Sequence, residues 1–233
     1  MKPLELVGQT VTPDGTVMRL TRRDTEYLIA AGGENLMSSR AHGSEEALAT
    51  MGLRRAQTLT RPSVLIGGLG MGFTLRAALD LLPAGATVVV AELVSEVVEW
   101  NRGPLGPLAG HPLKDRRVRV EMGDVGATLR SSRGQFDAVL LDVDNSPAAL
   151  TTPKNARLYD GGGIAAVRAA LKTEGVLAVW SAREDRAFVE RLQRGQFTVE
   201  VEHVRGRLKQ GGARHVIFLA QNKLSSGADP RRR

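Results

Sequence analysis

The feature that most constrains the fold is a regular alternation, from residue 62 onward, of β-branched apolar runs with helical stretches. Such alternation is typical of a parallel sheet that helices cover on both faces. The last two apolar runs are separated by a turn alone, so we expect an antiparallel hairpin at one edge of the sheet. The sequence therefore predicts an α/β fold with a Rossmann-like, doubly wound sheet of seven strands. The expected strands are residues 64–67, 87–91, 117–121, 136–142, 176–180, 198–204 and 215–220, and the expected helices are residues 73–82, 95–101, 125–130, 163–172 and 184–194.

The first 60 residues follow a different pattern. Short strand-like stretches lie on both sides of the turn Pro13-Asp14-Gly15, a further one covers residues 26–30, and Ser44 is the candidate N-cap of a helix. We expect three parts: a small N-terminal β hairpin unit plus helix (1–60), the Rossmann-like domain (61–222), and a disordered basic tail (223–233).

Composition narrows the class of protein. The chain has no cysteine, and its four histidines show no metal-ligand spacing, so we expect no metal. The N-terminus lacks the apolar core of a signal peptide, and no uncharged apolar run reaches membrane-spanning length. We therefore expect a cytoplasmic protein without a membrane partner.

The net charge of +7 raises the question of nucleic-acid binding. The arginines are spread along the chain, and the densest run, Arg231-Arg232-Arg233, lies in the expected tail. With 4% aromatic residues the chain also offers few rings on which bases could stack. A solvated basic surface is the favoured interpretation, and no nucleic-acid partner is expected.

A glycine-rich turn follows the first strand of the alternating region. Gly67, Gly68, Gly70 and Gly72 lie between that strand and the next helix in "VLIGGLGMGFTLRAAL". Glycine at such a place lets the backbone approach a ligand closely, and the helix N-terminus adds a positive dipole. A tight turn that needs positive φ angles explains the glycines equally well.

Acidic residues or glycine end the next three strands. Glu92 closes the second strand, Gly123-Asp124 the third, and Asp142 and Asp144 follow the fourth. The carboxyl ends of parallel strands form the edge at which open α/β sheets bind ligands, and an acidic residue after the second strand is placed to accept hydrogen bonds from ribose hydroxyls. For Asp124 an N-cap of the following helix is the alternative.

These motifs resemble a known family. From about Pro62 to Ala220 the chain is similar to the S-adenosylmethionine-dependent methyltransferase fold, and more narrowly to spermidine synthases (polyamine aminopropyltransferases). A fainter likeness to that family's small β domain covers "DGTVMRLTRRDTEYLI". The segments that carry the resemblance are "VLIGGLGMGFTLR", "VVVAELVSEVVEW", Gly123-Asp124, "FDAVLLDVDNSPAAL" and Leu158-Tyr159.

The resemblance implies a nucleoside-binding catalytic domain with decarboxylated S-adenosylmethionine, or S-adenosylmethionine itself, as co-substrate. Glu92 would hold the ribose, Gly123 and Asp124 the adenine, and the glycine loop the methionine-derived portion. Asp142 would be the catalytic carboxylate that deprotonates an amine nucleophile, and Asp144 would act beside it and bind a second ammonium.

Two departures from the family pattern bear on the substrates. Met71 stands where the family's loop carries an acidic residue that pairs with the aminopropyl ammonium of the donor. The family's Tyr-His-Glu segment is also missing, so Glu45, Glu46 or Tyr159 could complete the substrate-binding site instead.

The functional prediction is a spermidine synthase-like transferase that moves an aminopropyl group to a small-molecule amine. The alternative is an S-adenosylmethionine-dependent methyltransferase, which the loss of the acidic loop residue at Met71 motivates. A third interpretation is a nucleoside-binding protein without turnover, against which the retained Asp142 argues. A homodimer is left open.

Overall fold

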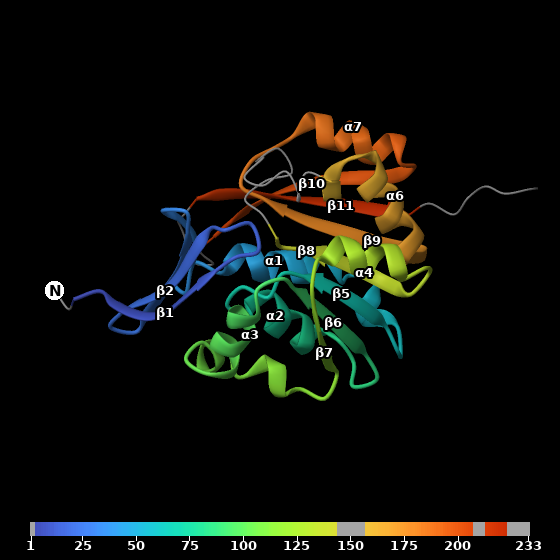
Figure 1. The fold of residues 1–233 in the computed structure, drawn as a ribbon. Helices are drawn as coiled ribbons and strands as arrows, with labels where there is room; N and C mark the ends of the chain where they lie inside the picture. The colour runs from blue at the N-terminus through green and yellow to red at the C-terminus, as the bar shows by residue number, and fades with distance from the viewer. Residues whose placement is uncertain (1–2, 144–156, 207–212, 223–233) are drawn as a thin grey trace, which may run out of the picture.

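Two sheets organise the chain. The computed structural model describes residues 3–143, 157–206 and 213–222 (Figure 1). A four-stranded antiparallel sheet has the order β1-β2-β3-β4, and a seven-stranded sheet has the order β10-β11-β9-β8-β5-β6-β7. The strands are β1 (Glu5–Val11), β2 (Val17–Arg23), β3 (Glu26–Ala31), β4 (Glu34–Ser38), β5 (Ser63–Gly67), β6 (Thr87–Glu92), β7 (Val118–Met122), β8 (Phe136–Leu141), β9 (Leu171–Ser181), β10 (Phe197–Arg205) and β11 (Arg214–Asn222).

The larger sheet confirms the predicted fold class. β5, β6, β7, β8 and β9 run parallel, whereas β11 is antiparallel to both β9 and β10. The strand order reverses at β5, from which the chain first builds toward β7 and then returns through β8. Ligands bind at such a reversal in doubly wound sheets, because the neighbouring loops leave the edge in opposite directions.

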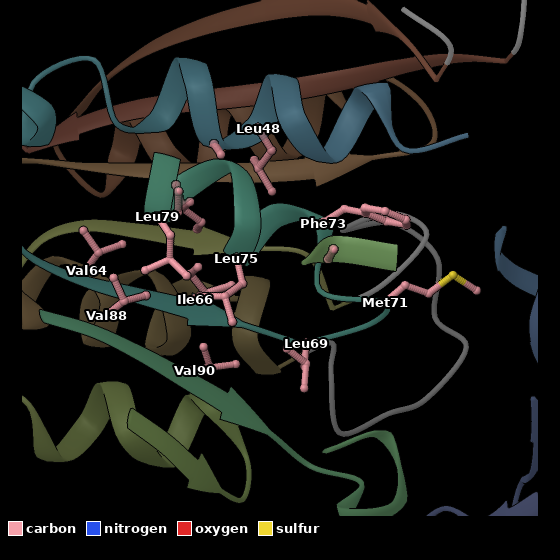
Figure 2. Packing of buried hydrophobic residues seen from close by; sticks show 14 of the residues in the cluster. Leu48, Val64, Ile66, Leu69, Met71, Phe73, Leu75, Leu79, Val88 and Val90 are labelled. Carbon is pink, nitrogen blue, oxygen red and sulfur yellow. The ribbon is translucent and has the colours of Figure 1, made fainter. Parts of the chain in front are cut away.

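Helices cover both faces of this sheet (Figure 1). One apolar cluster lies between the sheet and α1, α2 and α3, and Figure 2 shows part of it around Ile66 and Leu75. A second cluster lies under α4, α6 and α7. The helices are α1 (Gly43–Gly52), α2 (Phe73–Leu81), α3 (Ser95–Arg102), α4 (Val125–Ser131), α6 (Gly161–Ala170) and α7 (Arg186–Arg194), with short 3₁₀ turns at Ala56–Thr58, Gly106–Ala109 and Pro112–Lys114.

Strand β8 shows how the sequence produces this two-sided core. All six of its residues are buried. Ala138 and Leu140 belong to the first cluster, and Val139 and Leu141 to the second, because successive side chains of a strand point to opposite faces. This central parallel strand is therefore apolar on both faces from Ala138 to its end, where Asp142 follows, and its one charged residue, Asp137, pairs with Lys172 (2.6 Å).

The N-terminal unit has one strand more than expected. Strand β4 pairs with β3 and completes a four-stranded antiparallel sheet. Leu20 and Ile29 are buried in the first cluster, so this sheet shares an apolar core with α2 and α3. At a β-bulge in β1, Gly8 lies against the indole of Trp100, where an added Cβ would stand 2.5 Å from Nε1. The glycine thus permits close packing of β1 on α3.

Three local expectations need correction. Helix α1 has His42, not Ser44, as its N-cap, and the Ser44 hydroxyl donates to Oε2 of Glu45 instead (2.6 Å). Helix α6 ends at Ala170, and β9 already begins at Leu171, five residues earlier than expected for this strand. A positive φ of 61° at Glu174 accompanies the irregular start of β9, which hid this part of the strand from its apolar pattern.

None of the helices in the described ranges is both long and apolar enough to cross a membrane. The predicted disordered tail, residues 223–233, lies outside the described residues.

Candidate functional site

The predicted donor-binding residues and Asp142 converge at one edge of the seven-stranded sheet. Gly67 ends β5, Glu92 ends β6, and Asp142 directly follows β8. Gly123 and Asp124 follow β7 at the outer end of the same edge. Because β8, β5, β6 and β7 are parallel neighbours, their carboxyl ends lie side by side, as the sequence predicts.

The glycine loop has the backbone that its residues predict. Gly68, Gly70 and Gly72 have φ angles of 86°, 53° and 84°, in the left-handed region that side chains disfavour. The loop also touches the strand end next to it: the Asp142 amide donates to the Gly67 carbonyl (3.0 Å), and a Cβ on Gly68 would stand 2.5 Å from the Asp142 carbonyl. The loop and Asp142 therefore form one unit.

Glu92 is built into this loop. It is 7% exposed, its Oε2 accepts from the Leu69 amide (2.8 Å), and its Oε1 accepts from the Val94 amide (2.9 Å). Burial raises the pKa of Glu92, and the backbone donors oppose that rise. Each carboxylate oxygen can accept a second hydrogen bond, so the residue can anchor the loop and still bind a hydroxyl.

Asp124 is the N-cap of helix α4, which was the alternative interpretation of this residue. Its Oδ1 accepts from the Gly126 amide at the start of α4 (3.0 Å), and its Oδ2 forms an ion pair with Arg130 (3.4 Å). Its side chain is 57% exposed, which leaves it accessible to a ligand.

Two exposed apolar residues beside these carboxylates were missed in the sequence. Leu93 directly follows Glu92, and Met122 directly precedes Gly123; they are 48% and 53% exposed. Large apolar side chains at the ends of two adjacent strands offer a surface for a flat, apolar ring. Their positions directly beside Glu92 and Gly123 in the sequence could have identified them as candidate binding residues.

Asp142 is partly buried and paired with a hydroxyl. Thr74, in the first turn of α2, donates its Oγ1 hydrogen to Oδ2 of Asp142 (3.0 Å). Desolvation raises the pKa of Asp142 to about 6, and the Thr74 hydrogen bond acts in the opposite direction. A carboxylate with such a pKa can exchange a proton near neutral pH.

The second carboxylate of the site comes from α1. Glu45 is 6% exposed, and burial together with the nearby charge of Asp142 raises its pKa to about 7, against the hydrogen bond from Ser44. Glu46, by contrast, accepts from Nδ1 of His42 (2.7 Å), whose ring stacks on Phe73 with centroids 4.2 Å apart. Of the two glutamates, Glu45 is thus the one that interacts with Asp142.

Tyr159 lies on the other face of the sheet from this pair. The Tyr159 ring packs edge-on against Phe188 (5.6 Å) in the second apolar cluster, whereas Glu45 and Thr74 lie on helices of the first. The two clusters lie on opposite faces of the sheet. Asp144 is outside the described residues.

The position of the missing loop carboxylate is apolar. Met71 is fully buried, and its amide donates to Sδ of Met37 in β4 (3.2 Å). Figure 2 shows the Met71 side chain pointing away from Ile66 and Leu75. The N-terminal sheet therefore contacts the backbone of the glycine loop through the Met37 thioether, and Glu45 is a carboxylate that the fold brings close to Asp142 instead.

Trp180 stands beside Asp142 in the sheet. Leu141 pairs with Val179, so the next residues of the two parallel strands, Asp142 and Trp180, are neighbours at the strand ends. The indole lies 4.8 Å from the ring of His215. The position of Trp180 next to Asp142 was not apparent from the sequence.

Within the described ranges, no group of three or more histidine, aspartate or glutamate side chains is arranged to hold a metal ion.

Known proteins resemble this chain in sequence and in fold. No protein-family model matches it. A curated polyamine aminopropyltransferase from Bacillus mycoides is 28% identical over 116 residues, which are 49% of this chain and 39% of that enzyme. The match therefore spans about two fifths of the relative's length.

Solved spermidine synthases share the fold over nearly the whole chain. One, in complex with the transition-state analogue AdoDATO, gives a TM-score of 0.71 at 18% identity and covers 94% of this chain and 72% of that one. The enzyme from Thermotoga maritima gives 0.72 at 19% identity, with 94% and 73% covered. A probable spermidine synthase from Corynebacterium glutamicum gives 0.65 at 16% identity, with 95% and 83% covered. The resemblance predicted from the motifs is confirmed, and the chain has the spermidine synthase fold.

Proposed function

We propose that the protein is an aminopropyltransferase, which moves the aminopropyl group of decarboxylated S-adenosylmethionine to a small amine. The observation that carries this proposal is the pair Asp142 and Glu45, two desolvated carboxylates beside the glycine loop. The spermidine synthase fold and the curated relative support it. Residues 61–222 would be the nucleoside-binding catalytic domain.

The proposed reaction needs a base next to a cationic centre. The nitrogen of a neutral amine attacks the methylene carbon bonded to the sulfonium, the new C–N bond forms, and the C–S bond breaks. Its electron pair stays on sulfur, and methylthioadenosine leaves. The proton that the amine nitrogen loses passes to Asp142, whose pKa of about 6 suits a group that must be ionised before the step and protonated after it.

The donor nucleoside would bind along the edge formed by β5, β6 and β7. Glu92 would accept from the ribose hydroxyls, and Asp124 from the adenine amino group, with Gly123 allowing close approach. Leu93 and Met122 would pack on the adenine ring. Gly67, Gly68, Gly70 and Gly72 would line the methionine-derived part, because the absence of side chains there lets the donor reach the backbone.

The carboxylate pair also bears on the choice of donor. Two acidic groups next to the glycine loop favour a ligand whose tail is an ammonium, whereas the carboxylate of intact S-adenosylmethionine would be repelled. Met71 removes the loop carboxylate of the spermidine synthases, which is the observation behind the methyltransferase alternative. We propose that Glu45 provides negative charge in its place.

The acceptor would bind on the side of Asp142 where Trp180 lies. Its reacting amine would meet Asp142, and its carbon chain would pass the indole. Asp144 and Tyr159 stay proposed acceptor-binding residues, and cytoplasmic location, a metal-free reaction and a homodimer stay proposals as well.

The test is a product assay with both donors. The protein is incubated with decarboxylated S-adenosylmethionine and putrescine, cadaverine or spermidine, and with intact S-adenosylmethionine and the same amines. We expect methylthioadenosine from the first set and no product from the second. S-adenosylhomocysteine from the second set, without methylthioadenosine from the first, would establish the methyltransferase alternative.

A further inference from the structure

Asn101, in the last turn of α3, is a buried polar residue that the proposed mechanism does not yet use. It is 1% exposed and lies beneath the glycine loop. Its Nδ2 donates to the carbonyl of Gly70 (2.8 Å) and to the carbonyl of Val97 one turn earlier in the helix (2.9 Å). Both neighbours are acceptors, so the amide group can have no other orientation here.

The hydrogen bond to Gly70 explains why this buried position is polar. Burying a carboxamide costs free energy unless it is hydrogen-bonded, and an apolar residue would serve the helix alone equally well. The Val97 carbonyl belongs to the same helix. The bond that links two separate parts of the chain is the one to Gly70.

The other end of the same side chain lies close to the loop at Gly72. Oδ1 of Asn101 has no hydrogen-bond partner among the described residues, and it would stand 2.9 Å from a Cβ on Gly72. Gly72 is the N-cap of α2, so Asn101 contacts the loop both at Gly70 and at the start of the helix that carries Thr74.

The loop needs such support because its glycines are flexible. Three of the five residues from Gly68 to Gly72 have left-handed φ angles, and glycine loses more conformational freedom on ordering than any other residue. Glu92 anchors the loop at the Leu69 amide, and Asn101 anchors it at the next residue.

We propose that Asn101 is a positioning residue for the donor, which acts through Gly70 and holds the glycine loop in its binding conformation. The inference rests on the proposed donor site. It assigns Asn101 no contact with the reacting atoms, so its loss affects donor binding and leaves the chemical step at saturating donor nearly unchanged.

The experiment compares three variants. Asn101→Asp keeps the shape of the side chain but turns an oxygen toward the Gly70 carbonyl, Asn101→Ala removes both contacts, and Glu99→Gln changes an exposed residue of the same helix as the matched control. Measured are kcat, the KM values of donor and acceptor, the Kd of methylthioadenosine, and hydrogen exchange of the amides of residues 68–72.

For both Asn101 variants we expect the donor KM and the methylthioadenosine Kd to rise about tenfold, with kcat changed less than about twofold. The acceptor KM stays as in the wild type, and exchange accelerates in the loop but not across the sheet. Glu99→Gln matches the wild type. Unchanged loop exchange and nucleoside affinity would overturn the proposal, and so would a uniform loss of stability without a selective effect on the loop.

If Asn101→Ala does not fold, the isosteric Asn101→Asp decides alone. Nucleoside binding and hydrogen exchange also separate this inference from the proposed function. A selective loop effect without aminopropyl transfer would leave the role of Asn101 standing and overturn the reaction.

Discussion

The charge of Asp142, at the end of β8, raises the pKa of Glu45 in the first turn of α1. Glu45 is buried and Asp142 partly buried; burial is the largest cause of the raised pKa of Glu45 and the cause of the raised pKa of Asp142. Two carboxylates so placed are expensive to ionise together and attract cations or protons. The fold therefore keeps a poorly compensated negative site next to the glycine loop, and this suits a cationic donor and an amine acceptor.

The first prediction concerns stability against pH. The folded-state pKa of Glu45, about 7, lies above its ordinary value of 4.5, so the folded protein binds the proton more tightly than the unfolded chain. Stability from this group is present below pH 4.5 and is lost as the pH rises through 7. Relative to Glu45→Gln, the wild type should lose about 2–3 kcal/mol of unfolding free energy over this range.

Urea denaturation at several pH values between 4 and 8 measures this difference. Glu46→Gln is the matched control, since Glu46 is neighbour to Glu45 in the chain but pairs with His42. Parallel pH profiles for the wild type and Glu45→Gln would show that Glu45 is not desolvated as described.

The second prediction concerns Thr74, whose hydroxyl stabilises the ionised form of Asp142. Thr74→Val keeps the shape but removes the donor, so the pKa of Asp142 should rise further. The acid limb of the kcat profile should then move to higher pH, whereas Thr74→Ser should leave it in place. If the limb stays where it is in Thr74→Val, Asp142 is not the group that titrates.

The third prediction concerns Glu92. Glu92→Gln places an NH₂ group opposite one of the two amides, of Leu69 or Val94, that the carboxylate now accepts from. Nucleoside binding should weaken by about 1.5–3 kcal/mol, with little change in kcat at saturating donor. Calorimetry with methylthioadenosine checks the first part and steady-state kinetics the second. Full nucleoside affinity in this variant would remove Glu92 from the donor site.

The parts of the fold that the sequence predicts well are those with strong local patterns. Strands such as residues 136–141 are mostly apolar, and a doubly wound sheet brings their ends to one edge, so the placement of Glu92 and Asp142 at the same edge could be expected. Strand β4, with the sequence "ENLMS", has little apolar alternation and half-exposed residues, and it was missed. Its formation depends on pairing with β3.

The pairing of Glu45 with Asp142 could not be read from the sequence. Two neighbouring glutamates open α1, and which of them faces the sheet is set by how the helix packs on β9 and α2. The same holds for Asn101, whose partner Gly70 is distant in the chain. In both cases the contact arises from tertiary packing, which periodicity does not encode.

The most direct test of the central claim is a single-turnover measurement of methylthioadenosine release by Asp142→Asn. With the base removed and the shape preserved, release from decarboxylated S-adenosylmethionine in the presence of an amine should slow by about 10²-fold or more. The Kd of methylthioadenosine, measured on the same preparation, should match that of the wild type. Release at a near-normal rate, with only the thermal stability reduced, would show that Asp142 is a structural residue and would contradict the proposed mechanism.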